Sequence, residues 1–230
     1  MSDSQSVLPK TLNLPKNWDS IYAATGDYFF GTEPSQIAQT AFRFFEAFGG
    51  DPKTARALDL GSGEGRDTAL LAGAGMHVTA RDVSEVGLEK TRTLLARRGV
   101  PPERVDLAIA DIGAFEYPAA VYDIALAANV YQFLSPADVP GHLEKLKESV
   151  KPGGICAVGV FSPAMVGWGI ELENYWTATA DELLLFFSED AGWLLLDRTE
   201  YWTYQVRGQT QMSFSYVVAR KQEPLKQELL

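Results

Sequence analysis

The chain has 230 residues, of which 46% are hydrophobic, and its formal net charge is -10 at pH 7. This length and composition suit one globular domain with a sizeable core and argue against intrinsic disorder. An acidic surface repels a phosphate backbone, so nucleic acid is excluded as the main partner. The single cysteine, Cys156, lies in an apolar run and leaves neither a disulfide framework nor a cysteine-rich metal site, so we expect no bound metal and a reducing compartment.

The two ends of the chain are polar and resemble neither a leader nor a membrane anchor. Residues 1–16 lack the charged and apolar regions of a signal peptide, and no apolar run in the sequence reaches the length of a membrane span. The tail over 221–230 is expected to be loosely held. We therefore expect residues 1–230 to form one domain of a cytoplasmic protein that does not bind a membrane.

Between these ends, helix-like and strand-like patterns alternate along the sequence. Apolar residues at helical spacing predict a helix over 35–48, and Ser84 and Gly99 are the expected cap and stop of another. In chain order, the predicted elements are helix 35–48, strand 57–60, helix 65–74, strand 76–81, helix 84–98, strands 105–110 and 123–129, helix 135–150, strand 155–161, helix 179–188, and strands 193–201 and 211–220.

Three details of these elements bear on the fold. The run over 124–128 is apolar throughout, which is typical of a strand buried on both faces. Ser135 and Asp138 resemble a capping box with Asp in place of Glu or Gln, and residues 151–154 predict a turn before the fifth strand. The alternation as a whole predicts an α/β fold, a doubly wound and mostly parallel seven-stranded sheet with helices on both faces.

A glycine-rich loop follows the first strand, where the sequence over 59–65 reads Asp-Leu-Gly-Ser-Gly-Glu-Gly. Glycines at a strand-to-helix turn adopt positive φ and let the backbone approach a ligand closely. The spacing is Gly-x-Gly-x-Gly, whereas a dinucleotide-binding loop needs Gly-x-Gly-x-x-Gly. In that second register Arg66 would stand at the last glycine, which counts against a nicotinamide cofactor.

Two further acidic residues follow the ends of predicted strands. Asp82 comes after the second strand, where its carboxylate can accept hydrogen bonds from both hydroxyls of a ribose. Asp111 comes after the third strand and is followed by Ile112, a pair that can bind an adenine amino group and pack on its ring. Together with Asp59, these acids fall at the edge where open α/β sheets bind ligands.

These motifs, with the Lys-Pro-Gly-Gly turn at 151–154, resemble in sequence and order those of class I S-adenosylmethionine-dependent methyltransferases. The resemblance covers roughly residues 18–220. It implies a Rossmann-like methyltransferase fold, S-adenosyl-L-methionine as the cofactor, and methyl transfer to a small-molecule acceptor by in-line displacement. The cofactor-binding residues that it implies are Asp59, Gly61, Ser62, Gly63, Gly65, Asp82, Val83, Asp111, Ile112 and Asn129.

A narrower resemblance appears in the N-terminal segment. Residues 18–22 and 28–34 are similar to the small-molecule branch that includes tellurite-resistance and thiopurine-type methyltransferases, in which the N-terminal segment folds over the cofactor and substrate. We therefore expect residues 1–34 to form a lid segment, and the aromatic and glycine-rich loop over 162–177 to lie on the substrate side. The candidate substrate residues are Trp18, Tyr22, Tyr28, Tyr131, Phe161, Trp168 and Tyr175.

The sequence offers no residue that must act as a general base. His77 and His142 are interpreted as structural, because neither falls at the carboxyl end of a predicted strand. Methyl transfer needs a base only if the nucleophile starts protonated. Two alternatives therefore stay open: a non-methylating cofactor-binding protein or rearrangement catalyst on the same fold, and a nicotinamide-dependent oxidoreductase. The acceptor, the accepting atom and the oligomeric state are not specified by these motifs.

Overall fold

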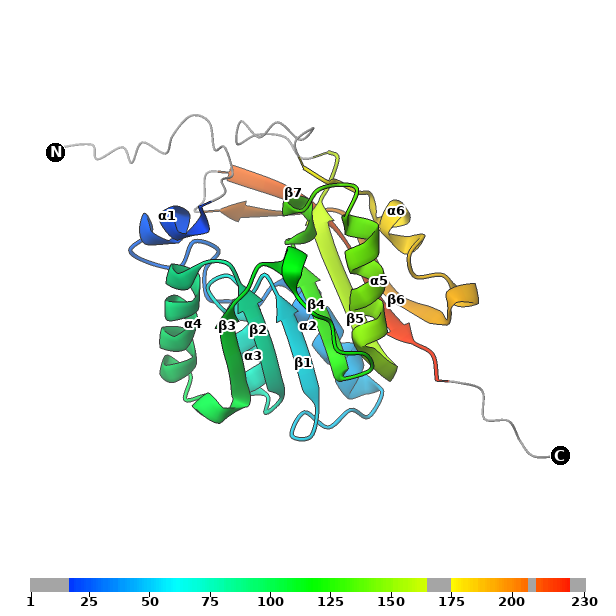
Figure 1. The fold of residues 1–230 in the computed structure, drawn as a ribbon, viewed down its shortest axis with the longest axis horizontal. Coiled ribbons are helices and arrows are strands. Elements are labelled where there is room, and N and C mark those ends of the chain that lie inside the picture. Colours follow the sequence, from blue (N-terminus) through cyan, green and yellow to red (C-terminus); the bar gives the residue numbers. More distant parts are fainter. Residues whose placement is uncertain (1–16, 165–174, 207–209, 224–230) are drawn as a thin grey trace.

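The computed structural model describes residues 17–164, 175–206 and 210–223, and in this part of the chain seven strands form one sheet (Figure 1). The strand order is β3-β2-β1-β4-β5-β7-β6. The strands are β1 (Arg56–Leu60), β2 (His77–Asp82), β3 (Val105–Ile109), β4 (Tyr122–Ala128), β5 (Val150–Phe161), β6 (Trp193–Val206) and β7 (Thr210–Lys221). β1 to β5 pair in parallel, and β7 is antiparallel to both β5 and β6. The predicted mostly parallel sheet is confirmed.

Helices cover both faces of this sheet (Figure 1). They are α1 (Trp18–Ala23), α2 (Gln36–Ala47), α3 (Arg66–Gly73), α4 (Glu85–Arg97), α5 (Val139–Ser149) and α6 (Ala180–Leu184). Residues of α2, α3 and α4, among them Ile37, Leu71 and Leu94, belong to the core on one face. Residues of α5 and α6, among them Leu143 and Leu183, belong to the core on the other. The sheet is therefore the middle of three layers.

The central strand β4 is buried on both faces, as its apolar run predicts. Ile124 and Leu126 belong to the core beneath α2 and α3, whereas Ala125 and Ala127 belong to the core beneath α5. All four side chains are at most 1% exposed. Because successive side chains of a strand point to opposite faces, an unbroken apolar run is what a strand between two helical layers requires.

The predicted start of α5 is wrong. Ser135 and Asp138 form no capping box, because α5 begins immediately after Asp138 and that residue makes no side-chain cap hydrogen bond. Pro140 stands in the first turn, where an N–H would have no intrahelical partner, so the proline costs no hydrogen bond. The N–H of Asp138 donates to the carbonyl of Ser135 at 2.9 Å. A capping box does form at α6, between Thr179 and Glu182.

Two other boundaries differ from the prediction. Residues 151–154 lie within β5, which begins at Val150, although Gly153 has a φ of +81° and the pairing with β4 shifts register there. The segment is thus an irregular start of the strand rather than a separate turn. The helix predicted over 179–188 ends at Leu184, because the chain turns back to begin β6 a few residues later.

Candidate functional site

A cavity of about 500 Å³ lies at the edge of the sheet where β1, β2 and β4 end. Its lining includes two groups of side chains on which the site is built. The acid end consists of Asp59, Glu64, Asp67, Asp82 and Asp111. The aromatic end consists of Trp18, Tyr22, Phe29, Phe30, Phe133, Phe161, Tyr175 and Phe214. This is the edge at which open α/β sheets bind ligands.

The loop over 61–65, between β1 and α3, has a shape that requires glycine at its first position. Gly61 has a φ of +67°, and a Cβ there would lie 2.3 Å from the side chain of Val130. The N–H groups of Gly61 and Ser62 both donate to the carbonyl of Arg81, at 2.8 and 3.0 Å. The loop is therefore pinned to the end of β2, with bare backbone against the cavity.

Asp82 is the last residue of β2, and only 7% of its surface is exposed. Its carboxylate accepts hydrogen bonds from the N–H of Gly63 at 2.8 Å and of Ser84 at 2.9 Å, one on each oxygen. Burial raises the pKa of Asp82 in spite of these donors. A carboxylate oxygen can accept a second hydrogen bond, so Asp82 keeps the capacity to receive two hydroxyl groups from a ligand.

Asp59 and Asp67 bring two more buried carboxylates to the acid end. The hydroxyl of Thr68 donates to Asp59 at 2.5 Å, and Asp67 accepts from the N–H and the hydroxyl of Ser35 at 2.6 and 2.7 Å. Burial, followed by repulsion from Asp67 and then Asp82, raises the pKa of Asp59 to about 7. Buried like charges at one wall favour a cationic group in the cavity.

The wall beyond Asp82 is formed by apolar side chains and one more acid. Val83 lines the cavity with 48% of its surface exposed, and Ile112 lines it with 6% exposed. Asp111 caps the short turn after β3, where its Oδ1 accepts from the N–H of Gly113 at 2.8 Å. The arrangement offers two apolar surfaces beside a carboxylate, which suits a flat ring that carries an N–H donor.

Three buried polar atoms of lining residues have no hydrogen-bond partner within the described part of the chain. They are Oγ of Ser62, Oδ1 of Asn129 and Oε1 of Gln132. Asn129 also has a left-handed φ of +61°, which is uncommon outside glycine. Buried polar atoms in native proteins are nearly always paired, so these three mark polar groups in the cavity wall that the described residues leave unsatisfied.

The aromatic end is a set of rings in mutual contact, in which Phe133 meets three others edge to face. Phe133 lies 5.1 Å from Trp18, and 5.8 Å from both Phe161 and Tyr175, between ring centroids. Phe214 lies 5.6 Å from Phe161. These rings come from α1, the turn after β4, the end of β5, the loop beyond it, and β7. They make an apolar wall suited to a flat or apolar group.

The structure brings most of the predicted site residues to this one cavity. Those that line it are Asp59, Gly61, Ser62, Gly63, Asp82, Val83, Asp111, Ile112, Asn129, Trp18, Tyr22, Phe161 and Tyr175. The lining side chains that the prediction missed include Phe29, Phe30, Glu64, Arg66, Asp67, Gln132, Phe133 and Phe214. Adjacency to the glycine loop was an available signal for Glu64, Arg66 and Asp67, because the first turn of the following helix faces the same edge.

Gly65 and Tyr28, two other predicted site residues, do not line the cavity. Gly65 is the N-cap of α3, and its φ of +83° and a Cβ distance of 2.4 Å to Thr91 show that it is needed for packing. The hydroxyl of Tyr28 donates to the carbonyl of Lys90 at 3.0 Å, which holds that ring against α4. Trp168 lies outside the described residues.

Tyr131 and the two histidines also stand away from the cavity. Tyr131 is fully buried beneath α5, where its hydroxyl donates to the carbonyl of His142 at 3.4 Å, and burial raises its pKa well above the ordinary value. Burial lowers the pKa of His142, whose Nδ1 lies 3.3 Å from the hydroxyl of Tyr117. His77 begins β2, at the end of that strand remote from the cavity.

Cys156 is the one thiol of the sequence and does not line the cavity. Cys156 is buried in the core beneath α5, where burial raises the pKa of its thiol. Among the described residues, no group of three or more His, Cys, Asp or Glu side chains is arranged to hold a metal ion. Over the same residues, no helix has the length and apolar character needed to cross a membrane.

Comparison with known proteins shows which proteins this chain is similar to. Residues 57–154 match the family described as a methyltransferase domain. A demethylmenaquinone methyltransferase from Clavibacter sepedonicus is 31% identical over 140 residues, which are 59% of this chain and 54% of that protein. The chain thus spans about half the length of the curated relatives that it matches.

Solved structures of methyltransferases share the fold over most of this chain. TehB from Haemophilus influenzae superposes with a TM-score of 0.62 at 19% identity, over 80% of this chain and 62% of that one. A 1,6-didemethyltoxoflavin-N1-methyltransferase from Burkholderia thailandensis, solved with bound 1,6-didemethyltoxoflavin and S-adenosylhomocysteine, superposes with a TM-score of 0.60 at 22% identity, over 84% and 80% of the two chains. The resemblance to class I S-adenosylmethionine-dependent methyltransferases and the Rossmann-like fold are confirmed.

Proposed function

We propose that this chain, which has the class I methyltransferase fold, is an enzyme that binds S-adenosyl-L-methionine and methylates a small molecule. The observation that carries the proposal is one cavity with an acid end and an aromatic end, set at the carboxyl edge of the sheet beside a Gly-x-Gly-x-Gly loop. An acid end suits the ribose and the ammonium group of the cofactor. An aromatic end suits a small, flat acceptor.

The residues that would hold the cofactor follow from their donors and acceptors. Asp82 would accept the two ribose hydroxyls, and Val83 and Ile112 would pack on the adenine ring beside Asp111. The buried carboxylate of Asp59 would face the ammonium group. When bound, the cofactor supplies a methyl group on a sulfonium centre, which needs no further activation by the protein.

The chain's own contribution is positioning and the exclusion of water. Trp18, Phe133 and Phe161 would hold the acceptor on one side of the cavity, while the glycine loop fixes the cofactor on the other. We assign no residue as a general base, because neither histidine of the sequence lines the cavity and methyl transfer needs a base only if the nucleophile starts protonated. The acceptor would then react as a neutral nucleophile or lose its proton to water.

The acceptor class is proposed from the same wall. Aromatic rings offer an apolar contact surface to a planar molecule, and that molecule need not be charged. The names of two similar proteins, the demethylmenaquinone and didemethyltoxoflavin methyltransferases, support a planar acceptor. We further propose that the chain acts as a single cytoplasmic domain on a free small molecule, with no nucleic acid or membrane as partner.

Calorimetry and a methylation assay test this proposal. S-adenosylhomocysteine should bind and NAD should not, and incubation with methyl-labelled cofactor and a panel of planar acceptors should move the label onto one of them. Tight binding of NAD without binding of S-adenosylhomocysteine would favour an oxidoreductase instead. A converted acceptor of unchanged mass would favour a rearrangement catalyst on the same fold.

A further inference from the structure

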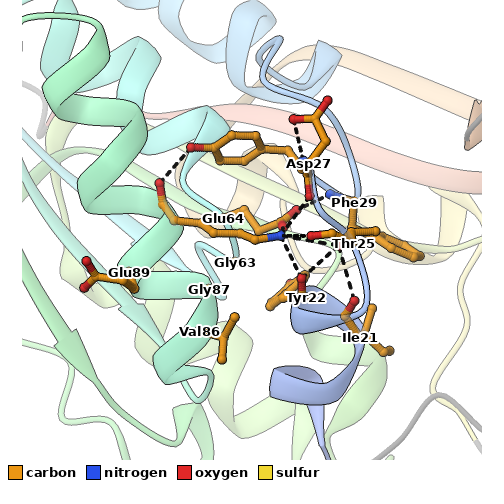
Figure 2. Close-up of polar contacts among 12 residues, drawn as sticks. Ile21, Tyr22, Thr25, Asp27, Phe29, Gly63, Glu64, Val86, Gly87 and Glu89 are labelled. Atoms are coloured by element: carbon orange, nitrogen blue, oxygen red, sulfur yellow. Dashed lines mark hydrogen bonds and ion pairs between the residues drawn. The ribbon is translucent and has the colours of Figure 1, made fainter.

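Lys90, on α4, does not line the cavity, yet its ammonium group holds together several parts of the molecule that do. It donates to the carbonyls of Tyr22, Asp27 and Thr25 at 2.7, 2.8 and 3.0 Å. These carbonyls belong to the end of α1 and the turn after it, so three backbone acceptors from one short segment converge on one cation. Figure 2 shows this segment lying over the glycine loop and α4.

The fourth partner of Lys90 is Glu64, the residue between the last two glycines of the loop. The ammonium lies 2.8 Å from Oε1 of Glu64, whose side chain is only 4% exposed. The other oxygen, Oε2, accepts from the N–H of Phe29 at 2.6 Å (Figure 2). A buried carboxylate is costly unless it is paired, so Glu64 requires both Lys90 and the backbone at Phe29 in place.

Packing ties the same segment to the loop. A Cβ on Gly87 of α4 would lie 2.8 Å from the carbonyl of Gly63 and 3.0 Å from the ring of Tyr22. A Cβ on Gly63 would lie 2.8 Å from the hydroxyl of Tyr22. The ring of Tyr22 therefore rests directly on the loop, and any change in the loop's conformation reaches that ring.

We propose that Lys90 and Glu64 are positioning residues that couple the glycine loop to the aromatic end. The pair holds residues 22–29 on the loop, so Tyr22 and Phe29 stand correctly in the cavity only when the loop has its cofactor-holding shape. The inference rests on the proposed function, because the cofactor is the ligand that fixes the loop. Coupling of this kind is reciprocal, so a ligand at the loop also tightens residues 22–29.

Hydrogen exchange and calorimetry on four proteins test the coupling: the wild type, Lys90→Met, Lys90→Arg and Arg92→Met. Without ligand, Lys90→Met should speed exchange over residues 18–29 by at least about tenfold and leave β1 and β4 unchanged, because only the local fastening is lost. Arg92, which pairs with Glu89 on the exposed side of the same helix, is the matched control and should behave as the wild type.

The ligand arm of the experiment uses S-adenosylhomocysteine. This ligand should slow exchange over residues 18–29 in the wild type and in Lys90→Arg, which keeps the charge, but not in Lys90→Met. The affinity of Lys90→Met for S-adenosylhomocysteine, measured by calorimetry, should fall less than about threefold. If Lys90→Met does not fold, Glu64→Gln takes its place in the exchange measurement without ligand only, since it removes the charge, keeps an acceptor for the N–H of Phe29 and lies in the cavity wall.

Two outcomes would overturn the coupling. One is exchange over residues 18–29 in Lys90→Met equal to the wild type. The other is faster exchange throughout the domain with ligand-induced protection intact, which marks a merely stabilising pair. Failure of the wild type to bind S-adenosylhomocysteine would instead overturn the proposed function, and the exchange measured without ligand would still decide whether Lys90 holds the segment.

Discussion

The acid end of the cavity is assembled from residues 59–111, within three neighbouring strands and their loops, whereas the aromatic end collects rings from Trp18 to Phe214. The acid end is held by backbone hydrogen bonds and by glycines with no room for a side chain. The aromatic end is held by side-chain packing between segments remote in sequence. Small changes of geometry should therefore harm the acid end more than the aromatic end.

The largest effect is expected from Gly61→Ala. Its Cβ would enter the side chain of Val130, so the loop must move, and binding of S-adenosylhomocysteine should become undetectable by calorimetry. Gly99→Ala is the matched control, because Gly99 has nearly the same φ, +68°, with nothing within 4 Å. The control isolates backbone strain, about 1–3 kcal/mol of stability, from the clash. Equal ligand binding by both variants would contradict a rigid acid end.

The next effect is expected from Asp82→Ala, which removes a hydrogen-bond acceptor from the acid end. Affinity for S-adenosylhomocysteine should fall by about 1–3 kcal/mol, because charge-assisted hydrogen bonds to hydroxyls are lost. Asp106→Ala is the control, since Asp106 is an exposed acid on β3, outside the cavity lining, that pairs with Arg81. Calorimetry that shows the same loss in both variants would remove Asp82 from the proposed ribose site.

A smaller effect is expected from Phe133→Ala at the aromatic end, on the acceptor and not on the cofactor. The KM for the acceptor found in the panel should rise about tenfold, through the loss of about 1–1.5 kcal/mol of ring contacts, while binding of S-adenosylhomocysteine changes little. Phe48→Ala, at an exposed ring outside the cavity, is the control. Steady-state kinetics that show a fall in cofactor affinity alone would mean that the two ends are not separate.

The smallest effect concerns pH and the acid end without ligand. The folded protein holds the proton of Asp59 up to about pH 7, against an ordinary pKa of 3.8, so the folded state binds more protons than the unfolded chain between these values. The free energy of unfolding contributed by Asp59 therefore falls as pH rises from about 4 to 7.

Asp59→Asn should remove this part of the pH dependence while keeping an oxygen for the hydroxyl of Thr68. Thermal melts at pH 5 and pH 8 should show a Tm difference that is smaller in the variant by at least a few °C, since each kcal/mol shifts the Tm of a domain of this size by about 2–4 °C. A Tm difference equal to that of the wild type would show that Asp59 does not carry the proton.

The acid end could be predicted from the sequence because its signals are local. Glycines and acids that directly follow predicted strands can be assigned to the carboxyl edge of the sheet, since the carboxyl ends of parallel strands meet at one edge. The mostly parallel sheet with helices on both faces also followed from the alternation of patterns, whereas the order of its strands was not predicted. Arg66 and Asp67 were missed only because the loop was read as ending at Gly65.

The aromatic end was predictable only in part, because its members are chosen by packing. Within the turn after β4, Tyr131 was selected, but the 3₁₀ turn directs Tyr131 into the core and gives Phe133 to the cavity. Phe214 carried no local signal, since only the pairing of β7 with β5 brings it beside Phe161. The sequence around Lys90 is typical of an exposed helix position, and only the tertiary contacts of its ammonium group distinguish it.

The place of β7 in the sheet has a consequence for how the protein is made. β7 leaves the ribosome after β6, yet it lies between β5 and β6, so β6 cannot take its place in the sheet before β7 arrives. Until then the apolar edge of β5, residues 155–161, has no neighbour, and an unpaired edge of this kind is prone to aggregate. The nascent chain therefore depends on rapid closure of its β6–β7 hairpin, and the same event delivers Phe214 to the cavity.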